Sequence, residues 1–193
     1  MLISRNDQGG FTLVETLIAL AIVAILLFLA APTFTAWIQN TRIRTTGDSI
    51  LTGLQLARAE AVRRNIPMRF QLTDTADNTC ALSTTGTNWV ISLTDPTGIC
   101  ATAPSDTGVI YQVRSAAEAS GNTTVAAGQA VYIYNGLGRL TAAPVGVIDI
   151  QNPTNGACAT ASGPTRCLRI VVSLSGLARM CDPARTSTDP QSC

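Results

Sequence analysis

The chain has 193 residues, enough for one membrane helix and one globular domain of roughly 130 residues. Its thirteen basic residues are all arginine, it has no histidine, and its formal net charge is only +1. The usual general bases and amine nucleophiles are therefore absent, and no close pair of carboxylates lies in a recognisable catalytic context. This composition argues against an enzyme, and the charge argues neither for nor against a polyanionic partner.

An apolar run over residues 11–31 follows a short polar leader, residues 1–10, that carries Arg5. A helix of about 20 apolar residues spans the hydrocarbon core of a bilayer, so the run predicts a transmembrane helix. Arg5 would then lie on the cytoplasmic side, because basic residues favour that side. The sequence predicts a single-pass membrane protein whose remainder is exported.

One carboxylate, Glu15, lies inside this apolar run. A charged side chain in a membrane is costly, so Glu15 needs a partner. If the chain is cut between Gly10 and Phe11, the new α-amino group lies one helical turn from Glu15. The amine and the carboxylate of neighbouring subunits can then neutralise each other at close range, and assembly satisfies both charges.

Apolar residues continue at helical spacing beyond the run, which predicts one helix from about residue 11 to residue 65. We expect it to be kinked or loosened near Pro32 and Gly47, and to end at Asn65 and Pro67. Its second half, residues 32–66, is amphipathic and should pack against the soluble domain.

Two sets of side chains define the faces of this second half. The apolar stripe of Leu51, Leu54 and Val62 should face the soluble domain. We expect the arginines to face solvent or a neighbouring subunit; they are Arg58, Arg63 and Arg64. Glu60 is expected to pair with Arg64 at the i, i+4 spacing, which contributes only a few tenths of a kcal/mol.

Residues 67–193 change to short β-like runs separated by turn residues, which predicts an antiparallel sheet or a small sandwich of five to seven strands. The candidate strands are 68–72, 89–94, 109–113, 123–125, 130–134, 147–151 and 168–174. Residues 135–138, Asn-Gly-Leu-Gly, are interpreted as a turn between strands, because no helix follows them as in a phosphate-binding loop.

Six cysteines lie in this β-rich region and none lies in the apolar run. An even number in loop-like sequence indicates disulfides formed outside the cytoplasm. Several connectivities are open, and we favour the local pairs that close short loops: Cys80 with Cys100, Cys158 with Cys167, and Cys181 with Cys193.

No cofactor and no metal is expected. Zinc is disfavoured because the chain has no CxxC pair and no histidine. Asp74, Asp77 and Asn78 offer oxygens for calcium, but without an EF-hand pattern they are interpreted as turn residues.

The arrangement of Gly10, Phe11 and Glu15 before an uninterrupted apolar stretch resembles the class III signal of type IV prepilins and type II secretion pseudopilins. The resemblance implies that a prepilin peptidase cuts after Gly10 and methylates the new amine at Phe11. It also implies that the helix first anchors the protein in the inner membrane and later packs into a filament core. A plain single-pass anchor with a chance Glu15 is the alternative.

Residues 54–65, LQLARAEAVRRN, resemble the helix signature of the minor-pilin family that includes FimT, FimU and GspH. Further segments that resemble this family lie at residues 89–95, 131–140 and 168–182. The resemblance implies an α+β, type IV pilin-like fold: a long N-terminal α-helix packed on an antiparallel β-rich globular head. It also implies a low-abundance subunit that assembles with other minor and major pilins through the N-terminal helix.

On this resemblance the expected function is a minor type IV pilin that primes or caps pilus assembly and so supports twitching motility, adhesion or DNA uptake. The protein would pass from the inner membrane, with its head in the periplasm, to the extracellular pilus. A GspH-like pseudopilin of type II secretion is an alternative, and the six cysteines favour the pilus.

A further alternative is a FimT-like pilin that binds DNA during transformation through C-terminal arginines. The candidates here are Arg166, Arg169, Arg179 and Arg185. Several arginines can hold phosphates in a salt-sensitive way without reading sequence. However, the family's Gly-Arg-x-Arg turn is Gly176-Leu177-Ala178-Arg179 here, without the first arginine. Solvated or Asp-paired arginines are the structural interpretation, which favours a FimU-like role.

Overall fold

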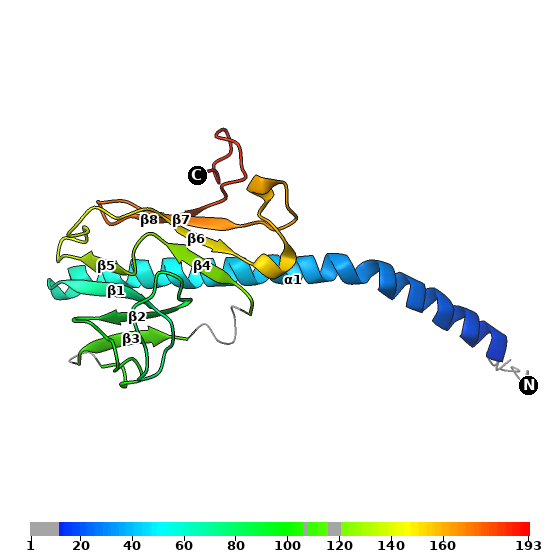
Figure 1. Ribbon diagram of the computed structural model, residues 1–193, viewed down its shortest axis with the longest axis horizontal. Helices are drawn as coiled ribbons and strands as arrows, with labels where there is room; N and C mark the ends of the chain where they lie inside the picture. Colours follow the sequence, from blue (N-terminus) through cyan, green and yellow to red (C-terminus); the bar gives the residue numbers. More distant parts are fainter. Residues whose placement is uncertain (1–11, 106–107, 116–120) are drawn as a thin grey trace, which may run out of the picture. The chain divides into compact units, whose positions relative to one another are not determined.

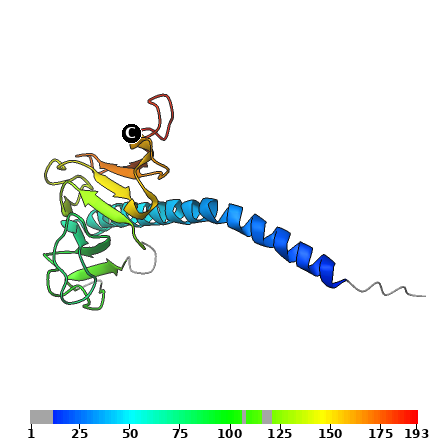
Figure 2. The same ribbon diagram turned by 45° about the vertical axis from the view of Figure 1, so that its right-hand side comes forward.

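The computed structural model describes residues 12–105, 108–115 and 121–193, apart from the side chains of residues 29–33 and 155. The described chain divides into two compact units, Met1–Trp37 and Ile38–Cys193. Figures 1 and 2 show the second unit, called the head here, in which two sheets pack on the C-terminal half of helix α1.

Helix α1 runs from Leu13 to Arg64, close to the predicted range of 11–65. Asn65 ends it with a left-handed backbone (φ 53°), and Pro67 follows, so the predicted end is confirmed. The helix is continuous at both Pro32 and Gly47, where the sequence predicted loosening.

Two glycines allow α1 to approach both sheets closely. A Cβ at Gly47 would lie 2.7 Å from Met180 Sδ, and a Cβ at Gly53 would lie 2.6 Å from Phe70 Cε2. Met180 belongs to one sheet of the head and Phe70 to the other. Gly47 is therefore explained by close packing and not by a break in the helix.

The part of α1 in the first unit exposes its large apolar side chains. From Leu13 to Phe28 their exposed fractions range from 49% to 82%. Within the described ranges, no helix has both the length and the apolar character needed to cross a membrane. The transmembrane helix predicted for residues 11–31 is thus not shown by the structure and stays a prediction.

The head contains two four-stranded sheets in which all neighbouring strands are antiparallel. The first sheet has the order β3-β2-β1-β5, with β1 Met68–Thr73, β2 Asn88–Ser92, β3 Ile110–Arg114 and β5 Val131–Tyr134. The second has the order β4-β6-β7-β8, with β4 Thr124–Ala127, β6 Ile148–Gln151, β7 Leu168–Val172 and β8 Ala178–Cys181. The predicted antiparallel, β-rich head is confirmed.

All seven predicted runs overlap a strand, and their ends differ from those of the strands by at most two residues. The eighth strand, β8, was missed. It has only four residues, Ala-Arg-Met-Cys, with no β-branched side chain and no clear alternation. The predicted strand 168–174 stops at Val172 because Ser173 N–H donates to Leu177 O (2.9 Å), which closes a hairpin that leads into β8.

The core of the head lies between one face of α1 and the two sheets. The helix contributes fully buried residues at helical spacing: Ile43, Ile50, Leu54, Ala57 and Ala61. Val62, predicted to face the core, is 51% exposed. It follows Ala61 directly, and one residue turns the helix by about 100°, which carries Val62 off the buried face.

The six cysteines form three disulfides in the favoured local pairs. Cys80–Cys100 packs with Val90 and Ile110 in a small core of its own. Two short 3-10 helices, η1 Pro153–Asn155 and η2 Ala159–Ala161, lie between β6 and β7, and Cys158–Cys167 closes the loop that holds η2. Cys181–Cys193 closes the C-terminal loop. The disulfides therefore tie down three loop regions of the head.

Candidate functional sites in the helix and the head

Of the residues predicted for processing and for assembly, Glu15, the assembly residue, lies in the described structure. Gly10 and Phe11 lie outside the described residues. Glu15 lies in the first turn of α1, and its backbone N–H donates to Thr12 Oγ1 (3.2 Å). Thr12 thus caps the helix, and Thr12-x-x-Glu15 has the spacing of a capping box, a signal that the sequence analysis missed. The carboxylate also complements the positive end of the helix dipole.

Near the other end of α1, Glu60 gathers two arginines. Its side chain is 8% exposed; Arg63 Nη2 donates to it at 2.7 Å and Arg64 Nε at 3.0 Å. The Arg64 guanidinium also lies over the Tyr111 ring, 4.7 Å from its centroid. The predicted Glu60–Arg64 pair is confirmed. The expectation that Arg64 faces solvent is wrong, since it connects α1 to strand β3.

These contacts set the pKa of Glu60. The hydrogen bond from Arg63 lowers the pKa below its ordinary value of 4.5, burial raises it, and the Arg64 hydrogen bond lowers it again, with a net decrease. The ionised carboxylate is therefore favoured in the folded head, and the cluster stabilises the helix–sheet contact.

Of the four DNA-binding candidates, Arg169 and Arg179 lie on β7 and β8. Arg169 Nε donates to Asp149 Oδ1 (2.6 Å) on the adjacent strand β6. This pairing raises the pKa of Arg169. Arg179 donates to the main-chain oxygens of Ser192 (3.2 Å) and Cys193 (3.1 Å). Arg179 thus holds the C-terminal disulfide loop against the sheet.

Arg166 and Arg185 meet at one carboxylate. Arg166 Nη2 lies 2.8 Å from Asp182, whose side chain is 6% exposed, and Arg185 Nε lies 3.6 Å from the same carboxylate. Arg185 also pairs with Asp189 at 2.9 Å. Three of the four candidates are therefore paired with aspartates, as in the structural interpretation.

Each of the three calcium candidates already accepts a hydrogen bond from a main-chain N–H group. Asp77 Oδ1 accepts from Thr79 N–H (2.8 Å), and the Thr79 hydroxyl is the main cause that lowers the pKa of Asp77. Asp74 Oδ1 accepts from Ala81 N–H, and Asn78 Oδ1 accepts from Ala101 N–H. Over the part of the chain that is described, no group of three or more His, Cys, Asp or Glu residues could hold a metal.

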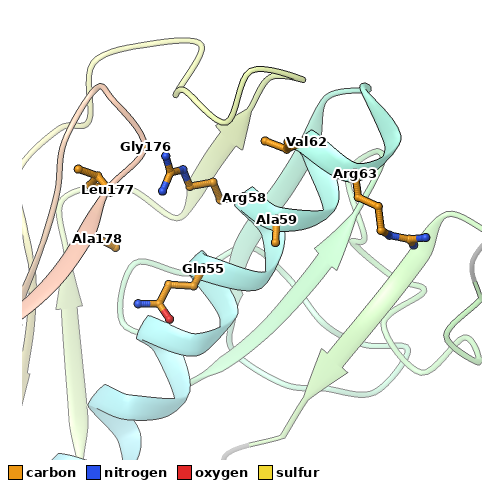
Figure 3. Close-up of a pocket in the computed structure, with 8 residues that line it drawn as sticks. All are labelled: Gln55, Arg58, Ala59, Val62, Arg63, Gly176, Leu177 and Ala178. Atoms are coloured by element: carbon orange, nitrogen blue, oxygen red, sulfur yellow. The ribbon is translucent and has the colours of Figure 1, made fainter.

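A pocket of about 530 Å³ lies between α1 and the start of β8 (Figure 3). It is lined by Gln55, Arg58, Ala59, Val62, Arg63, Gly176, Leu177 and Ala178. Arg58, predicted to face solvent or a neighbour, is partly buried, and its Nε donates to Gly138 O (3.0 Å). No pattern in the sequence predicted this pocket, because it depends on turns that are far from the helix in sequence.

Two turns meet beside Arg58. Gly176 has a φ of 83°, and a Cβ there would lie 1.9 Å from Gly138 O. Gly138 follows strand β5 of the first sheet, and Gly176 precedes strand β8 of the second. In the sequence, only the two Gly-Leu turns at 136–137 and 176–177 indicate this contact between the two sheets.

Comparison with known proteins gives two family matches. Residues 46–176 match the family described as "Type II transport protein GspH", and residues 5–31 match the "Prokaryotic N-terminal methylation motif". The second match covers Gly10, Phe11 and Glu15. Together the matches cover both ends of the long helix, without residues 32–45, and most of the head.

Individual relatives match different shares of the chain. The "Type II secretion system protein H" of Xanthomonas campestris pv. campestris is 33% identical over 66 residues, which cover 34% of this chain and 39% of that relative. Two crystal structures of the type IV minor pilin FimU of Pseudomonas aeruginosa are also similar, at TM-scores of 0.46. They are 16% and 17% identical and cover 78% of this chain, and 98% and 94% of their own lengths.

The GspH family match covers 131 residues, from 46 to 176, out of 193, and an N-terminal methylation motif precedes it. The family is one of structural subunits and not a class of enzymes. This chain belongs to the GspH family of type IV minor pilins and pseudopilins.

Proposed function

We propose that this chain is a minor type IV pilin that primes or caps pilus assembly and supports twitching motility, adhesion or DNA uptake. The observation that carries the proposal is the position of Glu15. Its carboxylate lies in the first turn of a helix whose large apolar side chains are exposed from Leu13 to Phe28. Such a surface needs a covering of lipid or of other helices. The methylation motif over residues 5–31 supports the same assignment.

In the proposed sequence of events, the protein inserts into the inner membrane with Arg5 in the cytoplasm and the head in the periplasm. A prepilin peptidase removes residues 1–10 and methylates Phe11. The helix then leaves the lipid and packs among the helices of other minor and major pilins, where the α-amino group of one subunit pairs with Glu15 of another. The periplasm is oxidising, which suits the three disulfides.

Glu15→Ala tests this proposal. We expect the variant to be cleaved normally but to enter filaments at least about tenfold less, because an unpaired terminal amine in an apolar bundle is costly. Immunoblots of sheared filaments and membranes measure both steps, and Glu15→Asp should recover part of the loss. Normal incorporation of Glu15→Ala would overturn the charge-pairing mechanism.

The second candidate is a pseudopilin of type II secretion. The GspH family match and the similarity to a type II secretion system protein H favour it. Deletion of the gene separates the two: a pilus subunit is required for surface pili, whereas a pseudopilin is required for export of folded periplasmic proteins. Both phenotypes can be scored in the same strain.

A further inference from the structure

The pocket beside Arg58 combines an apolar wall with one cation. Ala59 and Val62 of α1 face Leu177 and Ala178 across it, and Val62 and Leu177 are 51% and 59% exposed. Figure 3 shows the Arg58 guanidinium extending from the helix toward Gly176, while Arg63 extends away from the pocket. Arg58 is therefore the positive charge that a group in this pocket would meet.

Arg58 differs from the arginines that pair with carboxylates. In the part of the head that is described, its one hydrogen bond uses Nε, on Gly138 O, and no Asp or Glu pairs with it. That bond orients the guanidinium and leaves the two terminal nitrogens available. Arg63, also at the pocket, is already held by Glu60.

The Arg58 charge also lies against the apolar core. Burial raises the pKa of Tyr134, nearby Tyr132 raises it further, and the positive charge of Arg58 lowers it. Tyr134 is fully buried, and the Arg58 guanidinium is held on Gly138 O, four residues farther along the chain, so the guanidinium lies close to a region of low polarity. A partly desolvated cation attracts an anion more strongly there than in bulk water.

We infer that this pocket is a docking site for a segment of a neighbouring pilin that presents one carboxylate next to an aliphatic or aromatic side chain. The carboxylate would bind the terminal nitrogens of Arg58, and the apolar side chain would lie between Val62 and Leu177. Charge complementarity selects this occupant, because the cation lacks a carboxylate partner in the described head and the remaining wall is apolar. This inference rests on the proposed function, since it requires assembly with other subunits.

The test uses the full-length protein in its own host with a photo-crosslinking amino acid in place of Ala59. We expect one dominant cross-link, to a pilin peptide that contains Asp or Glu, in sheared filaments or in the membrane fraction. Arg58→Gln should lower its yield about tenfold, the effect of one lost charge-assisted hydrogen bond. Arg58→Lys should keep most of it.

The Gln and Lys variants both lose the Nε bond to Gly138, so they share any structural cost, and only Lys keeps the charge. Arg44→Gln is the matched control: Arg44 lies on the same helix, is 74% exposed and pairs with Asp48, so the yield should not change. Equal losses in Gln and Lys would overturn the inference. So would a cross-link to lipid or nucleic acid, a peptide without a carboxylate, or no cross-link.

Incorporation into sheared filaments is scored separately by immunoblot. Absence from filaments counts against the proposed function, and the membrane-fraction cross-link still decides the docking site. Normal incorporation without the cross-link overturns the docking site alone.

Discussion

The two units of the chain differ in how far their apolar side chains are exposed. In the first unit, large side chains from Leu13 to Phe28 are all at least 49% exposed, whereas Ile43, Ile50 and Leu54 in the head are fully buried. The head also has three disulfides of its own. The head therefore supplies its own core, and the first unit depends on what surrounds it.

The largest effect is expected when the leader is not removed, so that the first unit cannot pack into a filament. Gly10→Val should leave residues 1–10 attached, because a β-branched residue next to the scissile bond obstructs the peptidase. The retained leader removes the free amine that would pair with Glu15, so the variant should be missing from filaments. Immunoblots of membranes and filaments measure both results.

Gly9→Val is the matched control for this change, since it adds the same side chain one residue farther from the bond. It should be processed. Complete processing of Gly10→Val would show that the predicted cleavage site is wrong.

The next largest effect concerns the head alone. Gly176→Ala should destabilise it by about 3 kcal/mol, because the new Cβ would lie 1.9 Å from Gly138 O and the backbone is left-handed. Gly98→Ala is the control: its φ is 77°, but nothing lies within 4 Å of the new Cβ, so about 1 kcal/mol is expected. Denaturant unfolding of the oxidised protein measures both.

Equal destabilisation by the two alanines would mean that the turn contact is unimportant. A larger loss in Gly176→Ala would show that the junction of the two sheets stabilises the head.

A smaller effect is expected for Glu60→Gln, on the order of 2 kcal/mol, because two arginines lose their buried carboxylate partner. The folded-state pKa of Glu60 is lowered, so its stabilisation is complete above about pH 5. It is lost as the pH falls through the ordinary value of 4.5 toward the lowered folded value. Unfolding measured from pH 7 to pH 3 should therefore converge for the wild type and the variant.

Asp48→Asn is the control, because its pair with Arg44 spans 3.8 Å and both side chains are more than half exposed. It should cost only a few tenths of a kcal/mol. A pH-independent difference between Glu60→Gln and wild type would contradict the role given to the Glu60 charge.

The smallest effect is expected at the C-terminal arginines. Because three of them are paired with aspartates, replacing Arg166, Arg169, Arg179 and Arg185 by Gln should change DNA binding little. Electrophoretic shifts at about 0.15 M salt, with Arg44→Gln as control, measure this. A strong shift that disappears in the fourfold variant would support the DNA-receptor alternative instead.

Local patterns made most of the fold predictable. Helix α1 follows from periodic apolar residues and ends where Asn65 and Pro67 cannot continue it. The three disulfides were predictable because each pair closes a short loop. Seven strands were predictable from β-like runs between turn residues. Strand β8 was not predictable in this way, since it is set by a hairpin and by pairing with β7 more than by its own residues.

The sequence by itself determined the long helix, the β-rich head, the position of Glu15 inside an apolar run and the Glu60–Arg64 pair, because each depends on residues close together in the chain. Only the tertiary structure decided the partners of Arg58 and Arg169. Arg58 meets Gly138 across 80 residues, and Arg169 meets Asp149 because two strands align. Long-range contacts of this kind depend on how the sheets pack on the helix, and no local pattern of residues encodes them.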